Sequence, residues 1–166
     1  MNKVIQQGTP NLPRTAAPSN RLHRRRWLQA ALALSIGATF ISTAADAEEP
    51  IKVVYHVADG TDQATRALGN IRNELRAAPA TKIVVVALAD GIKLLLKDAA
   101  ERDGKPFEPQ VAALVEQGVE FRVCMNSLAA HDIALSRVIS VAKPVPSGVA
   151  EIARLQAREG YVYLRP

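Results

Sequence analysis

Cysteine occurs once in this sequence of 166 residues, at position 124 in the stretch GVEFRVCMNSL. The ionised thiol is a strong nucleophile, so Cys124 is the first candidate for chemistry. A lone cysteine cannot close a disulfide within its own chain. Three roles remain open: pairing with another molecule, a reactive thiol, or a small buried apolar side chain.

The segment that ends at Cys124 is one of several predicted strands. Runs of β-branched and apolar residues indicate strands. Where such a run is unbroken, it is typical of a strand in a parallel sheet that is buried on both faces. We predict three main strands and two shorter ones, at 51–57, 82–88, 119–124, 141–145 and 161–164.

Polar groups follow the first three of these strands. They are His56, then Asp90 and Gly91, then Cys124 and Asn126. The carboxyl ends of parallel strands meet at one edge of a sheet, where ligands bind. We therefore expect catalytic roles for Cys124 and His56, and ligand-binding roles for the other three. The alternatives are a hydrogen-bonded histidine at a strand end and an Asp-Gly pair that only makes a turn.

Helical spacing of apolar residues separates the strands. We predict helices around 64–75, 91–100, 109–118 and 147–160. Asp59 or Thr61 is expected to cap the first, and Ser147 and Gly160 to bound the last. In the last helix we expect Val149, Ile152 and Leu155 to point inward. Strands that alternate with helices predict a single α/β sandwich with a mostly parallel sheet.

The N-terminal segment, 1–47, is predicted to be an export signal. Arginines precede an apolar run at 27–41 that is too short to cross a bilayer, and Ala45-Asp46-Ala47 forms an A-x-A cleavage pattern. The string RRRWLQ at 24–29 resembles the twin-arginine export signal, the alternative being an ordinary secretory signal. We therefore predict a periplasmic protein whose mature domain is 48–166, with no membrane attachment after cleavage.

Charge and motifs exclude several functions for the predicted mature domain. Residues 1–47 hold six basic residues and one acidic residue, which accounts for the net charge of +5. The remainder is near neutral and offers no basic footprint for nucleic acid. Its two histidines and one cysteine lack the paired spacing of a zinc site. It contains neither a G-x-S-x-G elbow nor a phosphate-binding loop.

Residues 51–166 resemble the DsrE/DsrF-like family, in particular its small exported branch. The resemblance rests on the segments VVYHV, LGNIRNEL, KIVVVALADGIKLLL, GVEFRVCMNSL and VPSGVAEIARLQAREGYVYLRP. It implies a three-layer α/β/α sandwich with about five strands and a homo-oligomer, often a trimer or hexamer. In sulfur-relay members a cysteine at this strand end carries sulfur as a persulfide, and Cys124 matches that position.

The leading interpretation is a periplasmic sulfur-handling protein that carries persulfide on Cys124. His56 would stabilise the thiolate or orient the incoming sulfur, and Asn126 would donate a hydrogen bond nearby. The relay needs no redox cofactor, and its partners would be sulfur-donor and sulfur-acceptor proteins or small thiols. The alternative is a non-catalytic, homo-oligomeric module that binds a small ligand, with Cys124 as packing. A weaker third option is an enzyme that uses the Asp90 carboxylate.

Overall fold

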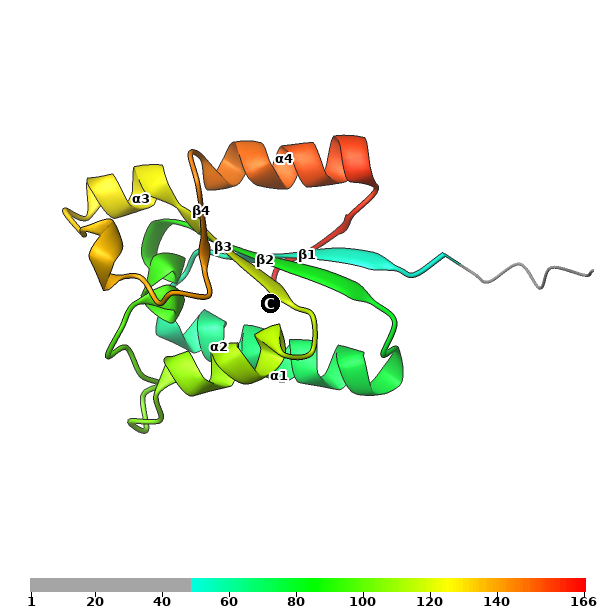
Figure 1. Cartoon of the computed structure of the whole chain (residues 1–166), viewed down its shortest axis with the longest axis horizontal. Coiled ribbons are helices and arrows are strands. Elements are labelled where there is room, and N and C mark those ends of the chain that lie inside the picture. The colour runs from blue at the N-terminus through cyan, green and yellow to red at the C-terminus, as the bar shows by residue number, and fades with distance from the viewer. Residues whose placement is uncertain (1–48) are drawn as a thin grey trace, which may run out of the picture. The chain divides into compact units, whose positions relative to one another are not determined.

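The computed structural model describes residues 49–166, which form three layers with a sheet in the middle (Figure 1). The predicted export signal lies outside the described residues. Helices α1 and α2 cover one face of the sheet, and α4 covers the other (Figure 1). The predicted α/β/α sandwich is therefore confirmed. Within 49–166, no helix combines the length and the apolar character needed to span a membrane.

The sheet has five strands, all parallel, in the order β4-β3-β2-β1-β5. The strands are β1 (Lys52–Val57), β2 (Lys82–Ala87), β3 (Glu120–Cys124), β4 (Lys143–Val145) and β5 (Val162–Leu164). The central strand β2 is buried on both faces along most of its length, as its unbroken apolar run predicts. All five strands end at the same edge, the edge at which the sequence places the candidate site.

The helices connect the strands on the two faces. They are α1 (Thr61–Ala77), η1 (Ala89–Leu95, a 3₁₀ helix), α2 (Phe107–Val115), α3 (Met125–Ala130), η2 (Leu135–Arg137, also 3₁₀) and α4 (Gly148–Glu159). The α4 boundaries agree with the sequence, because Ser147 accepts a hydrogen bond from the Ala150 N–H and Gly160 adopts the left-handed conformation that ends the helix.

Three local predictions were wrong. The predicted helix at 91–100 is the shorter 3₁₀ segment η1, which ends at Leu95. The N-cap of α1 is Gly60, with a φ of 83°, and neither Asp59 nor Thr61 caps the helix. Val149 points outward and is 66% exposed, because it lies in the first turn of α4 on the side away from the sheet.

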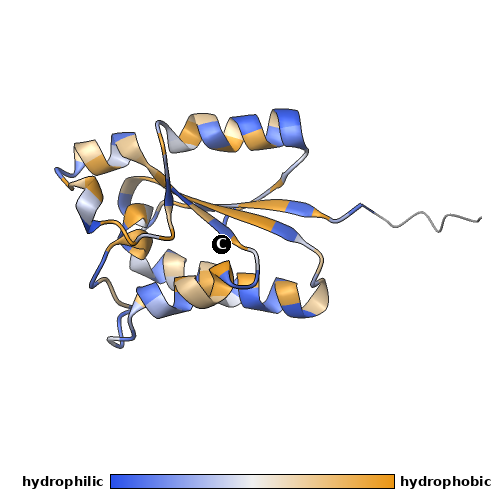
Figure 2. Cartoon of the chain, in the orientation of Figure 1, coloured by the Kyte–Doolittle hydropathy of each residue, from blue (hydrophilic) through white to orange (hydrophobic). Residues whose placement is uncertain are grey.

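The two faces of the sheet are packed differently. On the α1–α2 face, alternate strand residues join the helices in one large apolar cluster, which includes Tyr55, Val85 and Phe121. On the α4 face the cluster is small and holds Val54, Val84, Val86, Ile152 and Leu155. Apolar residues accordingly line the inner surfaces of the layers (Figure 2). Much of the space between α4 and the sheet is therefore left for polar groups.

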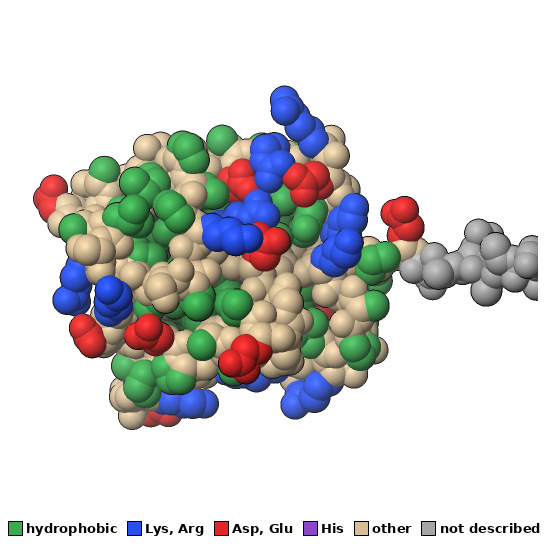
Figure 3. Space-filling model, in the orientation of Figure 1, with side chains coloured by type: hydrophobic (Ala, Val, Ile, Leu, Met, Phe, Trp, Pro, Cys, Tyr) green, Lys and Arg blue, Asp and Glu red, His purple; other side chains and the backbone are tan. Residues whose placement is uncertain are grey.

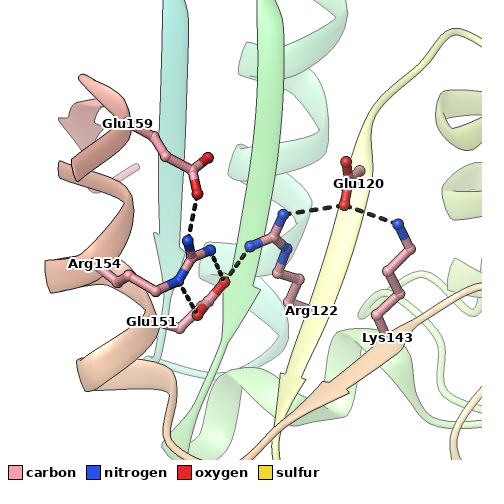
Figure 4. A network of polar contacts seen from close by, with 6 residues as sticks. All are labelled: Glu120, Arg122, Lys143, Glu151, Arg154 and Glu159. Atoms are coloured by element: carbon pink, nitrogen blue, oxygen red, sulfur yellow. Dashed lines mark hydrogen bonds and ion pairs between the residues drawn. The ribbon is translucent and has the colours of Figure 1, made fainter.

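An ion network fills part of that space (Figure 4). Arg122 of β3 pairs with Glu151 of α4 and, at 3.1 Å, with Glu120. Arg154 forms ion pairs with Glu151, at 2.8 Å, and with Glu159. Lys143 forms an ion pair with Glu120 at 3.0 Å. The side chains of Arg122 and Glu151 are only 14% and 13% exposed.

Two of the carboxylates in this network, Glu151 and Glu120, have lowered pKa values. Hydrogen bonding to Arg154 is the main cause at Glu151, and hydrogen bonding to Lys143 is the main cause at Glu120. Both groups therefore remain ionised at neutral pH. Interleaved basic and acidic side chains mark this region on the surface (Figure 3). The network fixes the position of α4, whose first residue lies over Cys124.

Candidate functional site

Cys124 is the last residue of β3 and the residue directly before α3. Successive strand residues point to opposite faces, so Cys124 shares the α4 face of the sheet with Arg122. It is only 4% exposed. The thiol therefore lies at the predicted edge of the sheet, but beneath the chain that connects β4 to α4 rather than on the open surface.

The surroundings of the Cys124 thiol favour its ionised form. Burial alone would raise the pKa of the Cys124 thiol, since it disfavours the charged form. The Ser127 hydroxyl and the backbone N–H groups of Gly148, Ser127 and Asn126 act in the opposite direction and outweigh burial. The net result is a pKa below the ordinary thiol value, which favours the thiolate.

A side chain at position 148 would come too close to Leu88 and Cys124. A Cβ atom at this position would lie 3.0 Å from Leu88 Cβ and 3.2 Å from Cys124 Cβ, closer than ordinary van der Waals contact. The absence of a side chain thus lets the first N–H group of α4 approach the sulfur. The ends of β2 and β3 and the start of α4 together form the environment of the thiol.

Asp90 and Gly91 lie beside this site, in η1. Asp90 is exposed and pairs with Lys93 at 2.6 Å, and hydrogen bonding to Lys93 lowers the pKa of the carboxyl. Gly91 is buried, and a Cβ there would lie 2.0 Å from the Val57 carbonyl oxygen. This contact gives Gly91 a structural role, because only glycine lets η1 approach the end of β1 so closely.

His56 lies on the same sheet face as Cys124 but is separated from it. Strand β2 runs between β1 and β3, so the two backbones are about 10 Å apart at ordinary strand spacing. The Nδ1 atom of His56 is 2.7 Å from the Tyr163 hydroxyl. Its Nε2 atom is buried and has no hydrogen-bond partner within residues 49–166.

The electrostatics of His56 belong to the β1–β5 end of the sheet. Burial, followed by the charge of Arg165, lowers the pKa of the imidazole, and Asp59 acts in the opposite direction. Arg165 and Asp59 themselves pair at 2.8 Å. The structure therefore does not bring the two predicted catalytic residues together.

Asn126 lies next to the thiol but acts through its backbone. Its N–H group donates a hydrogen bond of 3.3 Å to the Pro146 carbonyl oxygen and is also one of the groups that lower the pKa of the Cys124 thiol. The residue as a whole is exposed. No hydrogen bond of the Asn126 side chain occurs within residues 49–166, and its ligand-binding role stays a prediction.

The comparisons with known proteins agree with this architecture. Residues 30–166 match the DsrE/DsrF-like family. The chain belongs to that family. The membership confirms the resemblance noted from the sequence, and it suggests a function of the sulfur-relay type. Among curated proteins, none is similar enough to count as a match.

Two solved structures share the DsrE-like fold. One is the protein of unknown function MTH1491 from Methanobacterium thermoautotrophicum, at 31% identity and a TM-score of 0.62, over 70% of this chain and 99% of that one. The other is the ychN protein from E. coli, at 14% identity and a TM-score of 0.57, over 71% of this chain and 99% of that one. The second likeness shows the fold alone.

Two groups near Cys124 were not predicted from the sequence. Ser127 lies in α3, a short helix that the sequence analysis did not predict. Gly148 follows the recognised cap Ser147, but nothing in the sequence shows that α4 begins over the thiol. Tertiary contact alone brings Gly148 to Cys124.

An open cleft of about 360 Å³ lies at the same sheet edge but does not include the thiol. It is lined by Asp59, Gly60, Thr61, Asp62, Asp90, Lys93, Ala100 and Arg102. Its charged side chains largely pair with one another, as in Asp62 with Arg102. Within residues 49–166, no cluster of three metal-ligating side chains occurs.

Proposed function

We propose that the protein handles sulfur in the periplasm by carrying sulfane sulfur as a persulfide on Cys124. The observation that carries the proposal is the position of Cys124 at the carboxyl edge of the sheet, beneath Gly148, in surroundings that lower the pKa of the thiol although it is buried. A buried anion is costly unless hydrogen bonds replace its lost hydration. Hydrogen-bonding groups near the thiol lower its pKa, and a buried thiol that serves only as packing has no need of them.

The proposed reaction is an exchange between persulfides and thiolates. The Cys124 thiolate attacks the outer sulfur of a donor persulfide, R–S–S⁻. A bond forms between Cys124 Sγ and that sulfur, the donor S–S bond breaks, and its electron pair leaves with R–S⁻. The products are Cys124–S–S⁻ and a donor thiolate. Sulfur changes carrier without net oxidation, so no redox cofactor takes part.

A mass measurement tests this proposal. The purified protein is treated with a low-molecular-weight persulfide and is expected to gain the mass of one sulfur atom on the peptide that contains Cys124. A thiol reductant should remove the added sulfur. The Cys124→Ser variant serves as the control and should gain nothing. A native protein that stays at its original mass under these conditions excludes persulfide carrying.

One observation favours the alternative of a ligand-binding module. Cys124 is only 4% exposed, as expected for a packing residue. In that case the sheet edge would hold a small ligand without covalent chemistry. The reactivity of the thiol separates the two functions, as argued in the Discussion.

Export through the twin-arginine route is part of the proposal and rests on the RRRWLQ string and the A-x-A pattern. Cell fractionation of a chain in which Arg24 and Arg25 are both changed to lysine tests this route. Export that continues unchanged would exclude the twin-arginine route and leave the general secretory route.

We also propose that the domain is a homo-oligomer of at least three chains. The edge strand β5 presents Val162, Tyr163 and Leu164 to solvent, each at least 38% exposed. The opposite edge strand, β4, instead carries Lys143 and Pro144, residues that discourage edge-to-edge pairing. Because the family resemblance implies a trimer or hexamer, light scattering should give the mass of three or more chains. A monomer throughout the micromolar range would contradict the proposal.

A further inference from the structure

Strand β5 forms one outer edge of the sheet, and its apolar side chains are uncovered. Val162, Tyr163 and Leu164 are 55%, 38% and 40% exposed. β5 pairs with β1 on one side, and within residues 49–166 no strand lies on its other side. The outer backbone groups of an edge strand can pair with another strand, and natural proteins usually protect such an edge with charge or proline. The three residues of β5 include neither.

The sequence around β5 is complementary to itself in the opposite direction. The segment EGYVYLR, at 159–165, begins with an acidic residue, ends with a basic one and has a tyrosine on each side of Val162. In an antiparallel pair of two such segments centred on Val162, the opposed residues are Val162 with itself, Tyr161 with Tyr163, Gly160 with Leu164 and Glu159 with Arg165. Opposite charges therefore meet at both ends of the pair, and like charges do not face each other.

The two end charges are accessible on the edge. The side chain of Arg165 is 49% exposed and that of Glu159 is 40% exposed. Each already has a partner within the chain, Asp59 for Arg165 and Arg154 for Glu159. Glu159 is the last residue of α4, so the contact with Arg165 of a second copy is made by the side chains and not by strand pairing.

The faces of the sheet also match across such a pair. Tyr163 is in register with Val54 on the α4 face, and Tyr161 packs against the same apolar cluster. Val162 is in register with Val53 on the α1–α2 face. Opposed residues of an antiparallel pair point to the same face. The tyrosines of both copies therefore gather on the α4 face, where aromatic rings can pack against one another.

His56 holds one of these tyrosines in place. Its Nδ1 atom is 2.7 Å from the Tyr163 hydroxyl, and the two rings lie at 58° with centroids 5.8 Å apart. Tyr163 is therefore ordered on the α4 face although it is partly exposed. A side chain that is ordered in advance loses less entropy when a partner binds. His56 thus has a positioning role at the β5 edge.

The opposite edge of the sheet does not offer the same pairing. β4 contains Lys143 and Pro144, and proline has no N–H group to donate to a neighbouring strand. A head-to-tail contact between β5 of one copy and β4 of the next is therefore disfavoured. Pairing of β5 with β5 remains.

We propose that β5 pairs antiparallel with β5 of a second copy about a twofold axis at Val162, which joins two five-stranded sheets into one. This inference rests on the proposed homo-oligomer and names the surface that forms it. A contact between identical surfaces joins chains in pairs. The assembly therefore has an even number of chains, so of the trimer and the hexamer implied by the resemblance, this contact requires the hexamer.

Single cysteines in a Cys124→Ser background test the register. Val162→Cys places a thiol opposite the same residue of the second copy, with the Cα atoms about 4.5–5.5 Å apart, within the range of a disulfide. Under mild oxidation most of this variant should become a covalent dimer on non-reducing denaturing electrophoresis. Leu164→Cys is the matched control. Its two copies would lie roughly 14 Å apart along the paired strands, too far for a disulfide, so it should stay uncrosslinked.

Charge reversal tests the pairing without cysteine chemistry. Arg165→Glu and Glu159→Arg each place like charges together at both ends of the pair, and each should raise the concentration at which the assembly dissociates by about tenfold or more. The double variant loses the same contacts within each chain but restores opposite charges between the chains. It should recover the assembly of the wild type. Light scattering over a range of protein concentrations measures these shifts.

Three results would overturn the proposal. They are a Val162→Cys variant that does not crosslink, a Leu164→Cys variant that crosslinks equally well, and a double charge variant that dissociates as readily as the single ones. A wild-type mass of three chains would also overturn it, since an odd number leaves one β5 strand unpaired.

These results are distinct from the failure of the proposed function. A wild type of six chains without the Val162→Cys crosslink refutes only the β5 pairing. A wild type of two chains with that crosslink supports the β5 pairing and refutes the proposed assembly of three or more. Sulfur uptake on Cys124 is measured separately, on the wild-type protein, so persulfide carrying can fail while the β5 pairing stands.

Discussion

Replacing Gly91 with alanine should lower the free energy of unfolding by about 3 kcal/mol or more, among the largest effects of single substitutions. The added Cβ would lie 2.0 Å from the Val57 carbonyl oxygen, 2.4 Å from its carbon and 2.8 Å from the Ala58 nitrogen. All three atoms are backbone and cannot rotate away. The substitution must therefore displace either η1 or the end of β1. Urea denaturation followed by circular dichroism measures the effect.

Gly69→Ala is the matched control for this experiment. Gly69 lies inside α1, and a Cβ there would meet no atom within 4 Å across the described part of the chain. Because alanine favours the helix over glycine, this variant should gain up to about 1 kcal/mol of stability. If Gly91→Ala were as stable as the wild type, the close approach to Val57 would be refuted. Gly91 would then be free for the ligand-binding role predicted from the sequence.

The effect of Gly91→Ala should extend to the thiol. Gly91 fixes η1 against the end of β1, and its N–H group donates to the Leu88 carbonyl oxygen at 2.9 Å. Leu88 precedes Ala89, whose N–H group orients Ser127. In any fraction of Gly91→Ala that folds, displacement of this turn should therefore weaken the hydrogen bond from Ala89 to Ser127, which lies three residues after Cys124.

The sequence predicts the layers well because local patterns determine them. The run Val84-Val85-Val86 has no polar face, so it indicates a strand covered on both sides, and β2 is the central strand. Ser147 and Gly160 bound α4 because capping depends on a few adjacent residues. The short segment η1 was harder to predict, since its turn depends on contact between Gly91 and Val57.

The site was predicted only in part, because strand order is not a local property. The sequence places His56 and Cys124 at one sheet edge, but it does not show that β2 separates their strands. Gly148 is 24 residues from Cys124 in the chain and reaches it only when α4 packs on the sheet. Residue types therefore predicted the sheet edge at which Cys124 lies, while the approach of Gly148 to Cys124 required the tertiary structure.

Cys124 in the native protein should react with a small alkylating reagent such as iodoacetamide at neutral pH. The thiolate is the reacting species, so the rate rises with pH and levels off above the pKa. Because the pKa of Cys124 is lowered, the midpoint should lie below the ordinary thiol value of 9.0. The rate against pH, measured on the folded protein, gives this midpoint directly.

The same measurement separates a persulfide carrier from a packing residue. A thiol that reacts only through unfolding is limited by the unfolded fraction, roughly one part in a thousand or less for a stable domain. A reactive Cys124 should therefore be alkylated at least about a thousandfold faster, and urea below the unfolding transition should leave its rate unchanged. His56→Ala is the matched control and should keep the midpoint, since β2 separates its strand from that of Cys124. If alkylation instead accelerates with urea in step with unfolding, Cys124 is a packing residue and the ligand-binding module becomes the better explanation.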